Sequence, residues 1–166
     1  MTGLTWAVAA VVTDDAGRVL LCRGGRRWAL PGGRLRRLAC PAGAVADEIR
    51  RETGRSVEVT DLVGIYHLSD APCGRAAASG PPSDVLVHVF RARVLARPDA
   101  APPTGCALAW HRPQALPEQF TPVTRAAVAD ALAGRSGVLC DLRPDDPAQA
   151  TVGTTPAGAG PAGRHR

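Results

Sequence analysis

Two glutamates and a pair of glycines form the pattern in this sequence that is best suited to chemistry. Glu48 and Glu52 stand four residues apart in "ADEIRRETG" (46–54), so a helix through this segment places both carboxylates on one face. Gly32 and Gly33 precede the segment, and a loop without side chains lets backbone oxygens approach a ligand closely. Carboxylate and carbonyl oxygens are ligands of hard divalent cations. The pattern is therefore compatible with a cradle for Mg²⁺ and a chain of phosphates.

Arg51 lies between the two glutamates, where a third acid would complete such a site. A guanidinium about 6 Å from a divalent ion, at an effective dielectric near 20, is repelled by roughly 5 kcal/mol. The long side chain can turn toward Asp47 or solvent, so Arg51 predicts weaker metal binding rather than none. A second interpretation stays open: on an ordinary solvated helix, "DEIRRE" is a set of ion pairs, with Asp47 and Arg51 foremost.

Arginines gather around the segment "WALPGG" (28–33) with no acid among them. We assign Arg23 and Arg34 to substrate binding, and the cluster also contains Arg26, Arg27, Arg36 and Arg37. Guanidinium groups bind phosphate oxygens through paired hydrogen bonds, so this cluster suits a diphosphate. A solvated basic surface is the alternative, because all 20 basic residues are Arg and the net charge of +5 then partly reflects composition.

Trp28 and three histidines are weaker candidates. Trp28 could stack on a base, but its position before "LPGG" favours packing against the domain. His67, His88 and His111 are far apart and show no metal-ligand spacing. Asp99 is the only acid between residues 97 and 110, so a further metal ligand outside the helix is not identified.

The elements that must position these residues follow from the spacing of apolar and turn residues. A helix is expected over residues 41–53, because Pro41 suits the first helical position and Gly54 a helix end. A second helix is expected from the N-cap Thr121 to Gly134, with an apolar stripe of Val123, Ala127, Val128, Ala131 and Leu132. Strands are expected over residues 5–13 and 18–23, joined as a hairpin by "DDAG", and over 57–68, 84–95 and 106–111, with a loop over 69–83.

The length of 166 residues suffices for one domain with a full hydrophobic core. We expect this domain over residues 1–142 and a disordered tail over residues 143–166, which lack apolar periodicity. No apolar run approaches the roughly 20 residues that span a bilayer, and five scattered cysteines indicate reduced thiols. These features predict a cytoplasmic protein without membrane or specific nucleic-acid partners, and they leave a homodimer open.

Residues 5–133 resemble the Nudix hydrolase family. The shared features are an apolar strand, a "RVLL" strand, "WALPGG", and a box written G-x5-E-x7-R-E-U-x-E-E-x-G-U, where U is a bulky apolar residue. Starting at Gly33, the matches are Gly33, Glu48, Ile49, Glu52 and Gly54. The departures are Ala39, Asp47, Arg51 and Arg55, which replace the first Glu, the Arg, the middle Glu and the last apolar residue. Later, "LAWHRPQALPE" and "TPVTRAAVADAL" resemble the family's W-centred strand and terminal helix.

The resemblance implies an α+β fold, the Nudix α/β/α sandwich with a mixed β-sheet. It implies that Glu48 and Glu52 hold the Mg²⁺ or Mn²⁺ ion and are the catalytic residues, with Gly32 or Gly33 lending a backbone oxygen. The expected reaction is cleavage of the diphosphate linkage in a small nucleoside diphosphate derivative. Loops outside the box determine which derivative is the substrate. Because Ala39, Asp47 and Arg51 replace box residues, we expect weakened activity. A catalytically inactive nucleotide- or metabolite-binding module and a protein-interaction domain are the alternatives.

Overall fold

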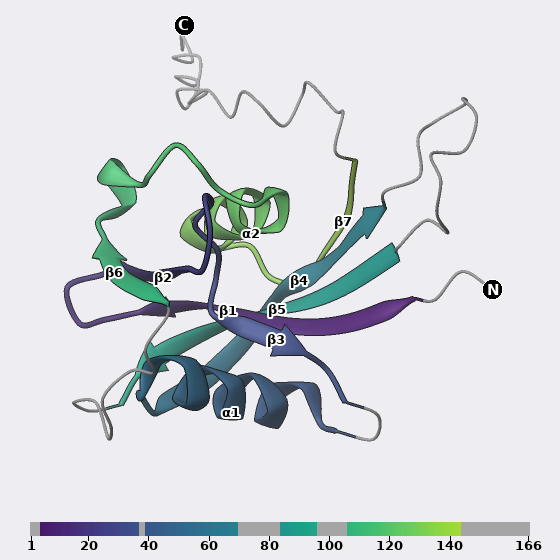
Figure 1. The fold of residues 1–166 in the computed structure, drawn as a ribbon, viewed down its shortest axis with the longest axis horizontal. Coiled ribbons are helices and arrows are strands. Elements are labelled where there is room, and N and C mark those ends of the chain that lie inside the picture. The colour runs from purple at the N-terminus through teal and green to yellow at the C-terminus, as the bar shows by residue number, and fades with distance from the viewer. Residues whose placement is uncertain (1–3, 37–38, 70–83, 96–105, 144–166) are drawn as a thin grey trace, which may run out of the picture.

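A seven-stranded mixed sheet lies between two helices (Figure 1). The computed structural model describes residues 4–36, 39–69, 84–95 and 106–143. The strands are β1 (Thr5–Thr13), β2 (Val19–Arg23), β3 (Gly32–Arg34), β4 (Val57–Ser69), β5 (Asp84–Val94), β6 (Ala107–His111) and β7 (Val138–Leu142). The helices are α1 (Pro41–Thr53) and α2 (Pro122–Leu132), and a short 3-10 turn, η1 (Pro113–Ala115), follows β6.

The sheet has the strand order β6-β2-β1-β5-β4-β7, and β3 pairs with β1 outside this path. β1 pairs with β5 and β4 pairs with β7 in parallel, whereas the other pairings are antiparallel. This arrangement confirms the expected mixed sheet between helices. The hairpin of residues 5–13 and 18–23 is also confirmed, since β1 and β2 are antiparallel neighbours.

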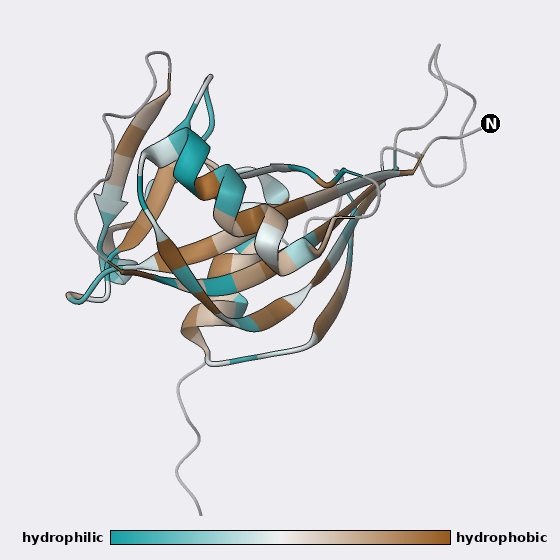
Figure 2. Cartoon of the chain, turned by 90° about the horizontal axis from the view of Figure 1, so that it is seen from below, coloured by the Kyte–Doolittle hydropathy of each residue, from teal (hydrophilic) through white to brown (hydrophobic). Residues whose placement is uncertain are grey.

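Alternation along β1 divides the core into two layers. Val8, Ala10 and Val12 face α1 and pack with Val45 and Ile49 of that helix. On the opposite face, a second cluster joins the sheet to α2 through Ala9, Val11, Ala127 and Val128. Since successive residues of a strand point to opposite faces, a nearly continuous apolar strand buries both of its faces. Figure 2 shows the result in colour, with the hydrophilic residues of α1 turned away from brown strands.

The two helices begin and end where local signals place them. Pro41 opens α1, and Gly54 closes it with a left-handed backbone (φ 67°), its N–H donating to the Arg50 carbonyl. Thr121 caps α2 by accepting from the Thr124 N–H. α2 ends at Leu132, and Leu132 is 45% exposed. Of the expected apolar stripe, Ala127 and Val128 are buried and Val123 and Ala131 are partly buried against the core, whereas Leu132 is exposed at the end of the helix.

β3 and β7 were not predicted. β3 contains two glycines and is only three residues long, so its sequence lacks any strand-like apolar pattern. β7 has an exposed Leu139 (81%) and a buried Leu142 (1%). A strand of only five residues is too short for this alternation to be a clear signal in the sequence. Both strands form because a longer strand, β1 or β4, offers them free hydrogen-bonding groups.

Hydrogen bonds connect α2 to the segment that precedes the glycines of β3 and to β4. The Thr124 hydroxyl accepts a hydrogen bond from the Leu30 N–H at 3.0 Å. Deeper in the core, the Tyr66 hydroxyl donates to Asp130 at 2.7 Å, and Asp130 also pairs with Arg135 at 2.6 Å. These bonds tie α2 to β4 and to Leu30, so the segment before β3 is held from the side opposite α1.

Four of the expectations fall wholly or mainly on residues outside the described ranges. The disordered tail, apart from Arg143, lies there, as do Arg37, Asp99 and nearly all of the loop over 69–83. Among the residues that the structure does describe, no helix is long and apolar enough to cross a membrane. The four described cysteines, Cys22, Cys40, Cys106 and Cys140, are all free thiols.

Candidate active site

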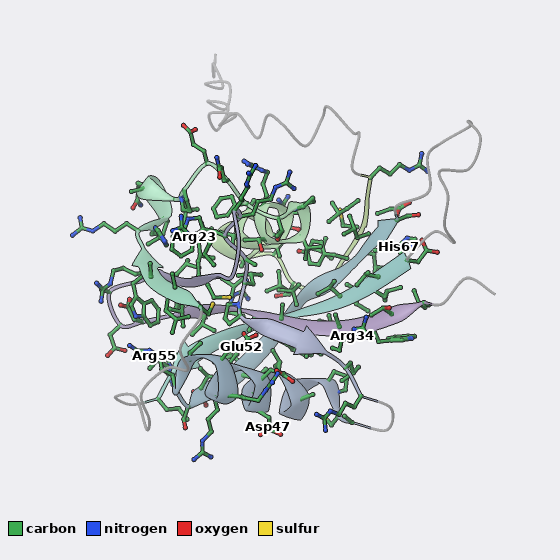
Figure 3. All side chains as sticks on the ribbon, viewed as in Figure 1. Arg23, Arg34, Asp47, Glu52, Arg55 and His67 are labelled. Carbon is green, nitrogen blue, oxygen red and sulfur yellow. The ribbon has the colours of Figure 1, made fainter. Side chains whose placement is uncertain are left out.

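The glutamates of α1 and the glycines of β3 lie against one another. The Gly32 N–H donates a hydrogen bond to Oε2 of Glu52 at 3.0 Å. A Cβ atom built on Gly33 would lie 2.9 Å from the carboxyl carbon of Glu48, which places that carboxylate directly against the backbone of β3. The structure therefore brings together all four residues that the sequence singled out as a cradle, and Figure 3 shows Glu52 between α1 and the sheet.

Glycine is required at position 32 by the closeness of two strands. A Cβ atom there would collide with the carbonyl oxygen of Val8 and crowd Ala9. Because Gly32 and Gly33 pair with Ala9 and Val8 of β1, the segment is held as a strand rather than as a free loop. The backbone beside the carboxylates is thus positioned before any ligand arrives.

Arg51 forms an ion pair with Glu48, three residues earlier on α1. The prediction that Arg51 pairs foremost with Asp47 was therefore wrong. The side chain of Glu48 is only 16% exposed, whereas that of Arg51 is 71% exposed, and a carboxylate withdrawn from water attracts a cation more strongly. Asp47 is exposed on the outer side of α1 (Figure 3), where water competes for its charge.

Burial changes the acidity of two groups at this site. Burial raises the pKa of the Glu52 carboxyl above its ordinary value, the charge of Glu48 adds to this, and the Gly32 N–H and Arg51 oppose it. Burial, followed by the negative charge of Glu52, raises the pKa of the Cys22 thiol to about 12. Cys22 is therefore a protonated neighbour of the carboxylates and not a nucleophile.

The donor set fits a hard divalent cation held by few protein ligands. Two carboxylates, Glu48 and Glu52, lie one helical turn apart against the glycine backbone of β3. Within the described part of the chain, no group of three or more His, Cys, Asp or Glu side chains could hold a metal ion. Mg²⁺ is commonly bound through one or two carboxylates, with water and substrate phosphates completing its shell. Two side chains therefore match Mg²⁺ better than a metal that needs a complete protein cage.

Arg34 and Arg23, both predicted to bind substrate, lie in different places (Figure 3). Arg34 ends β3 and lines two cavities, one beside α1 and one on the α2 side of the sheet. Arg23 lies on the α2 side, where its guanidinium stands 5.1 Å from the ring centre of Trp28. The structure does not bring Arg23 beside the two glutamates.

Trp28 packs rather than stands free. Its ring meets that of His111 edge to face, with centres 4.9 Å apart, and it lies against the α2-side core. His88 stacks on Trp6 at 5.6 Å, and His67 approaches Asp141 at 2.9 Å. No histidine that the structure describes is paired with Glu48 or Glu52, which agrees with the absence of ligand spacing in the sequence.

A cavity of about 470 Å³ on the α2 side was missed by sequence reasoning. Its floor is apolar and comes from β1 and β5, its wall from the start of α2 with the hydroxyls of Thr121 and Thr124, and its rim from Gly32, Gly33 and Arg34. No local signal marks this cavity, because its lining comes from four separate segments. A second cavity, of about 400 Å³, lies beside α1 and includes Glu48 and Arg51 in its lining.

Comparison with known proteins agrees with this architecture. The sequence matches the NUDIX domain over residues 3–131. It is 30% identical over 130 residues to a MutT-like protein of Streptomyces ambofaciens, covering 77% of each chain. A NUDIX hydrolase from Nitrosomonas europaea superposes with a TM-score of 0.59 and 27% identity, over 82% of this chain and 94% of the other. A MutT NUDIX hydrolase from Burkholderia pseudomallei gives a TM-score of 0.61 at 24% identity, over 77% and 98%. The chain belongs to the Nudix hydrolase family.

Proposed function

We propose that this protein hydrolyses the diphosphate linkage of a small nucleoside diphosphate derivative with the help of Mg²⁺ or Mn²⁺. The observation that carries the proposal is the convergence of Glu48 and Glu52 on Gly32 and Gly33. Membership of a hydrolase family supports the reaction class, and the position of the two carboxylates supports a cation site.

Each residue of the site has a distinct part in this proposal. Glu48 and Glu52 hold the cation, and the Gly32 N–H keeps the Glu52 carboxylate in place. A divalent cation supplies charge that offsets the developing charge of the diphosphate, and it makes an attacking water more acidic. Arg34 binds phosphate oxygen from the end of β3, where it lines both cavities.

The α2-side cavity suits the nucleoside part of the substrate. Its volume of about 470 Å³ falls in the range of small-molecule sites, and such sites combine apolar walls with a few polar groups. Val85, Val87 and Val123 provide the apolar surface, and Thr121 and Thr124 provide hydroxyl groups. Because Gly33 rims this cavity and also touches Glu48, a nucleoside bound there would direct its phosphates toward the carboxylates.

A catalytically inactive nucleotide-binding module is the second candidate function. The ion pair between Arg51 and Glu48 favours it, because a cation must share one of its two carboxylate ligands with a guanidinium. The α2-side cavity does not depend on that ion pair, so nucleotide binding would survive the loss of chemistry.

A screen of nucleoside diphosphate derivatives with Mg²⁺ or Mn²⁺, reading nucleotide release, tests the first function against the second. Replacing both Glu48 and Glu52 by Gln should abolish turnover and Mn²⁺ binding while the domain stays folded. Glu58→Gln is the matched control, because Glu58 lies on β4 and pairs with Arg93, away from the site. Nucleotide binding without turnover in the wild-type protein would favour the inactive module. Equal Mn²⁺ affinity before and after the double substitution would place the cation elsewhere.

A further inference from the structure

Three arginines line the cavity of about 400 Å³ beside α1. They are Arg34 of β3, Arg36 just after it, and Arg51 of α1. The acids in the lining are Asp47 and Glu48, and Glu48 is already paired with Arg51. Neither Arg34 nor Arg36 forms an ion pair with any residue in the described ranges, so the three arginines outnumber the two acids of the lining and leave it a net positive charge.

Arg51 has hydrogen-bonding capacity to spare. A guanidinium carries five N–H donors, and the bond to Glu48 uses a donor on one terminal nitrogen. The side chain is 71% exposed, so its remaining donors face the cavity and solvent. Glu48 thus fixes the position of Arg51 while leaving the guanidinium free to bind an anion on its other edge.

The rest of the lining is small and leaves the space open. Ala39, Cys40, Gly43 and Ala44 complete the wall, and a Cβ atom on Gly43 would meet nothing within 4 Å. The first turn of α1 contains no acidic residue, so the two acids of the lining, Asp47 and Glu48, lie farther along the helix. Charge from three arginines and space for a phosphate group therefore coincide within one cavity.

We propose that this cavity binds a phosphate group of the substrate directly, through Arg34, Arg36 and Arg51. The inference rests on the function proposed above and assigns the phosphate end of that substrate to this cavity. Arg51 then has a positive use at the position where the family's box carries an acid. Its guanidinium stabilises the negative charge of the phosphate. A site with a third carboxylate at this position would need an additional divalent ion for the same purpose.

The proposal separates phosphate binding from metal binding. Guanidinium groups bind phosphate without a metal, so the protein should bind inorganic pyrophosphate in the presence of EDTA. A phosphate site built on cations held by Glu48 and Glu52 would lose this binding when the metal is removed. Calorimetric titration of the full chain with pyrophosphate in EDTA therefore reads the arginine site alone.

Arg51→Gln and Arg36→Gln should each weaken this binding at least tenfold, since each variant loses a charge-assisted hydrogen bond to the phosphate. Arg51→Lys should bind between wild type and Arg51→Gln, because lysine keeps the charge but loses the paired donors. Arg112→Gln is the control for the loss of one positive charge, since Arg112 lies outside the cavity lining; its affinity should be unchanged. Thermal unfolding verifies that every variant is folded.

Absence of pyrophosphate binding in EDTA, or equal affinities of the wild type, Arg51→Gln and Arg36→Gln, would overturn the inference. These outcomes are distinct from failure of the proposed function, which is read from metal-dependent turnover. Turnover without metal-free pyrophosphate binding would keep the hydrolase and reject the arginine site.

Discussion

Arg51 binds Glu48, its neighbour one turn back on α1, rather than Asp47. The guanidinium of Arg51, which lies between the two glutamates in the sequence, is therefore held by one of them although its side chain remains largely exposed. This contact makes Glu48 the shared element of the site, since it touches β3 at Gly33, pairs with Arg51 and is a proposed metal ligand. Loss of the middle acid thus changes the charge of the site and also occupies one of its remaining ligands.

Arg51→Glu should tighten metal binding. The substitution removes the guanidinium that competes for Glu48 and adds a carboxylate between Glu48 and Glu52. The helix should tolerate it, because Glu and Arg have similar helix propensity, although the new carboxylate lies beside Glu48, the present partner of Arg51, and these like charges cost a few tenths of a kcal/mol without a metal ion. Titration with Mn²⁺ should show a higher affinity than the wild type, and the Mg²⁺ concentration for half-maximal turnover should fall.

Arg50→Glu on the same helix is the control for a general change of charge, and it should alter the metal affinity less. An unchanged or weaker Mn²⁺ affinity in folded Arg51→Glu would mean that the cation does not bind between Glu48 and Glu52.

Glu52 should make the metal-free protein less stable as the pH rises. Burial raises the pKa of this carboxyl in the folded state, so its ionised form is disfavoured by folding. Its contribution to the free energy of unfolding is then fully present below the unfolded-state pKa, and is lost as the pH rises through the folded-state pKa. Glu52→Gln keeps an acceptor for the Gly32 N–H and removes the charge. In EDTA, its melting temperature should therefore exceed that of the wild type near pH 7.

The difference should shrink toward pH 4, where the wild-type carboxyl is increasingly protonated. For a domain of this size, about 1 kcal/mol corresponds to a shift of roughly 2–4 °C. Thermal unfolding of both proteins across this pH range measures the effect. A wild type that is more stable than Glu52→Gln near pH 7, without metal, would show that the folded protein favours the charged carboxylate.

Gly33→Ala should disturb the cation site while leaving the fold intact. The added methyl group would lie 2.9 Å from the carboxyl carbon of Glu48, so Glu48 has to move away from β3. We expect weaker Mn²⁺ binding and only a small change of melting temperature, since the side chain that must yield is flexible. Gly43→Ala is the matched control, because its methyl group meets nothing within 4 Å and alanine favours the helix interior. Equal Mn²⁺ affinities of the two variants would show that contact between Glu48 and Gly33 does not matter for the ion.

Deletion of residues 144–166 should leave the domain intact. These residues lack the apolar pattern that a core requires, and the last strand, β7, ends before them at Leu142. The shortened protein should have the same melting temperature and the same turnover as the full chain. A fall of several degrees in melting temperature would show that the tail packs on the domain.

Local signals in the sequence determined the helices and much of the sheet. α1 runs from Pro41 to Thr53 as expected, because a proline at its start and a glycine after its end act on their immediate neighbours. The spacing of Glu48 and Glu52 placed both carboxylates on one face for the same reason, since helical geometry relates residues four apart. The long strands β1, β4 and β5 were equally visible as apolar runs.

The tertiary structure alone decided what those elements meet. β3 and β7 are strands because β1 and β4 present free edges to them. The sequence of such a short segment does not indicate which distant strand it will pair with. Arg51 pairs with Glu48 and not with Asp47 because packing of α1 against the sheet shields the carboxylate of Glu48 and leaves that of Asp47 exposed. Arg23 and Arg34 are eleven residues apart in a single basic cluster of the sequence, but they end up in different places. β2 places Arg23 against Trp28, whereas β3 places Arg34 in the lining of both cavities.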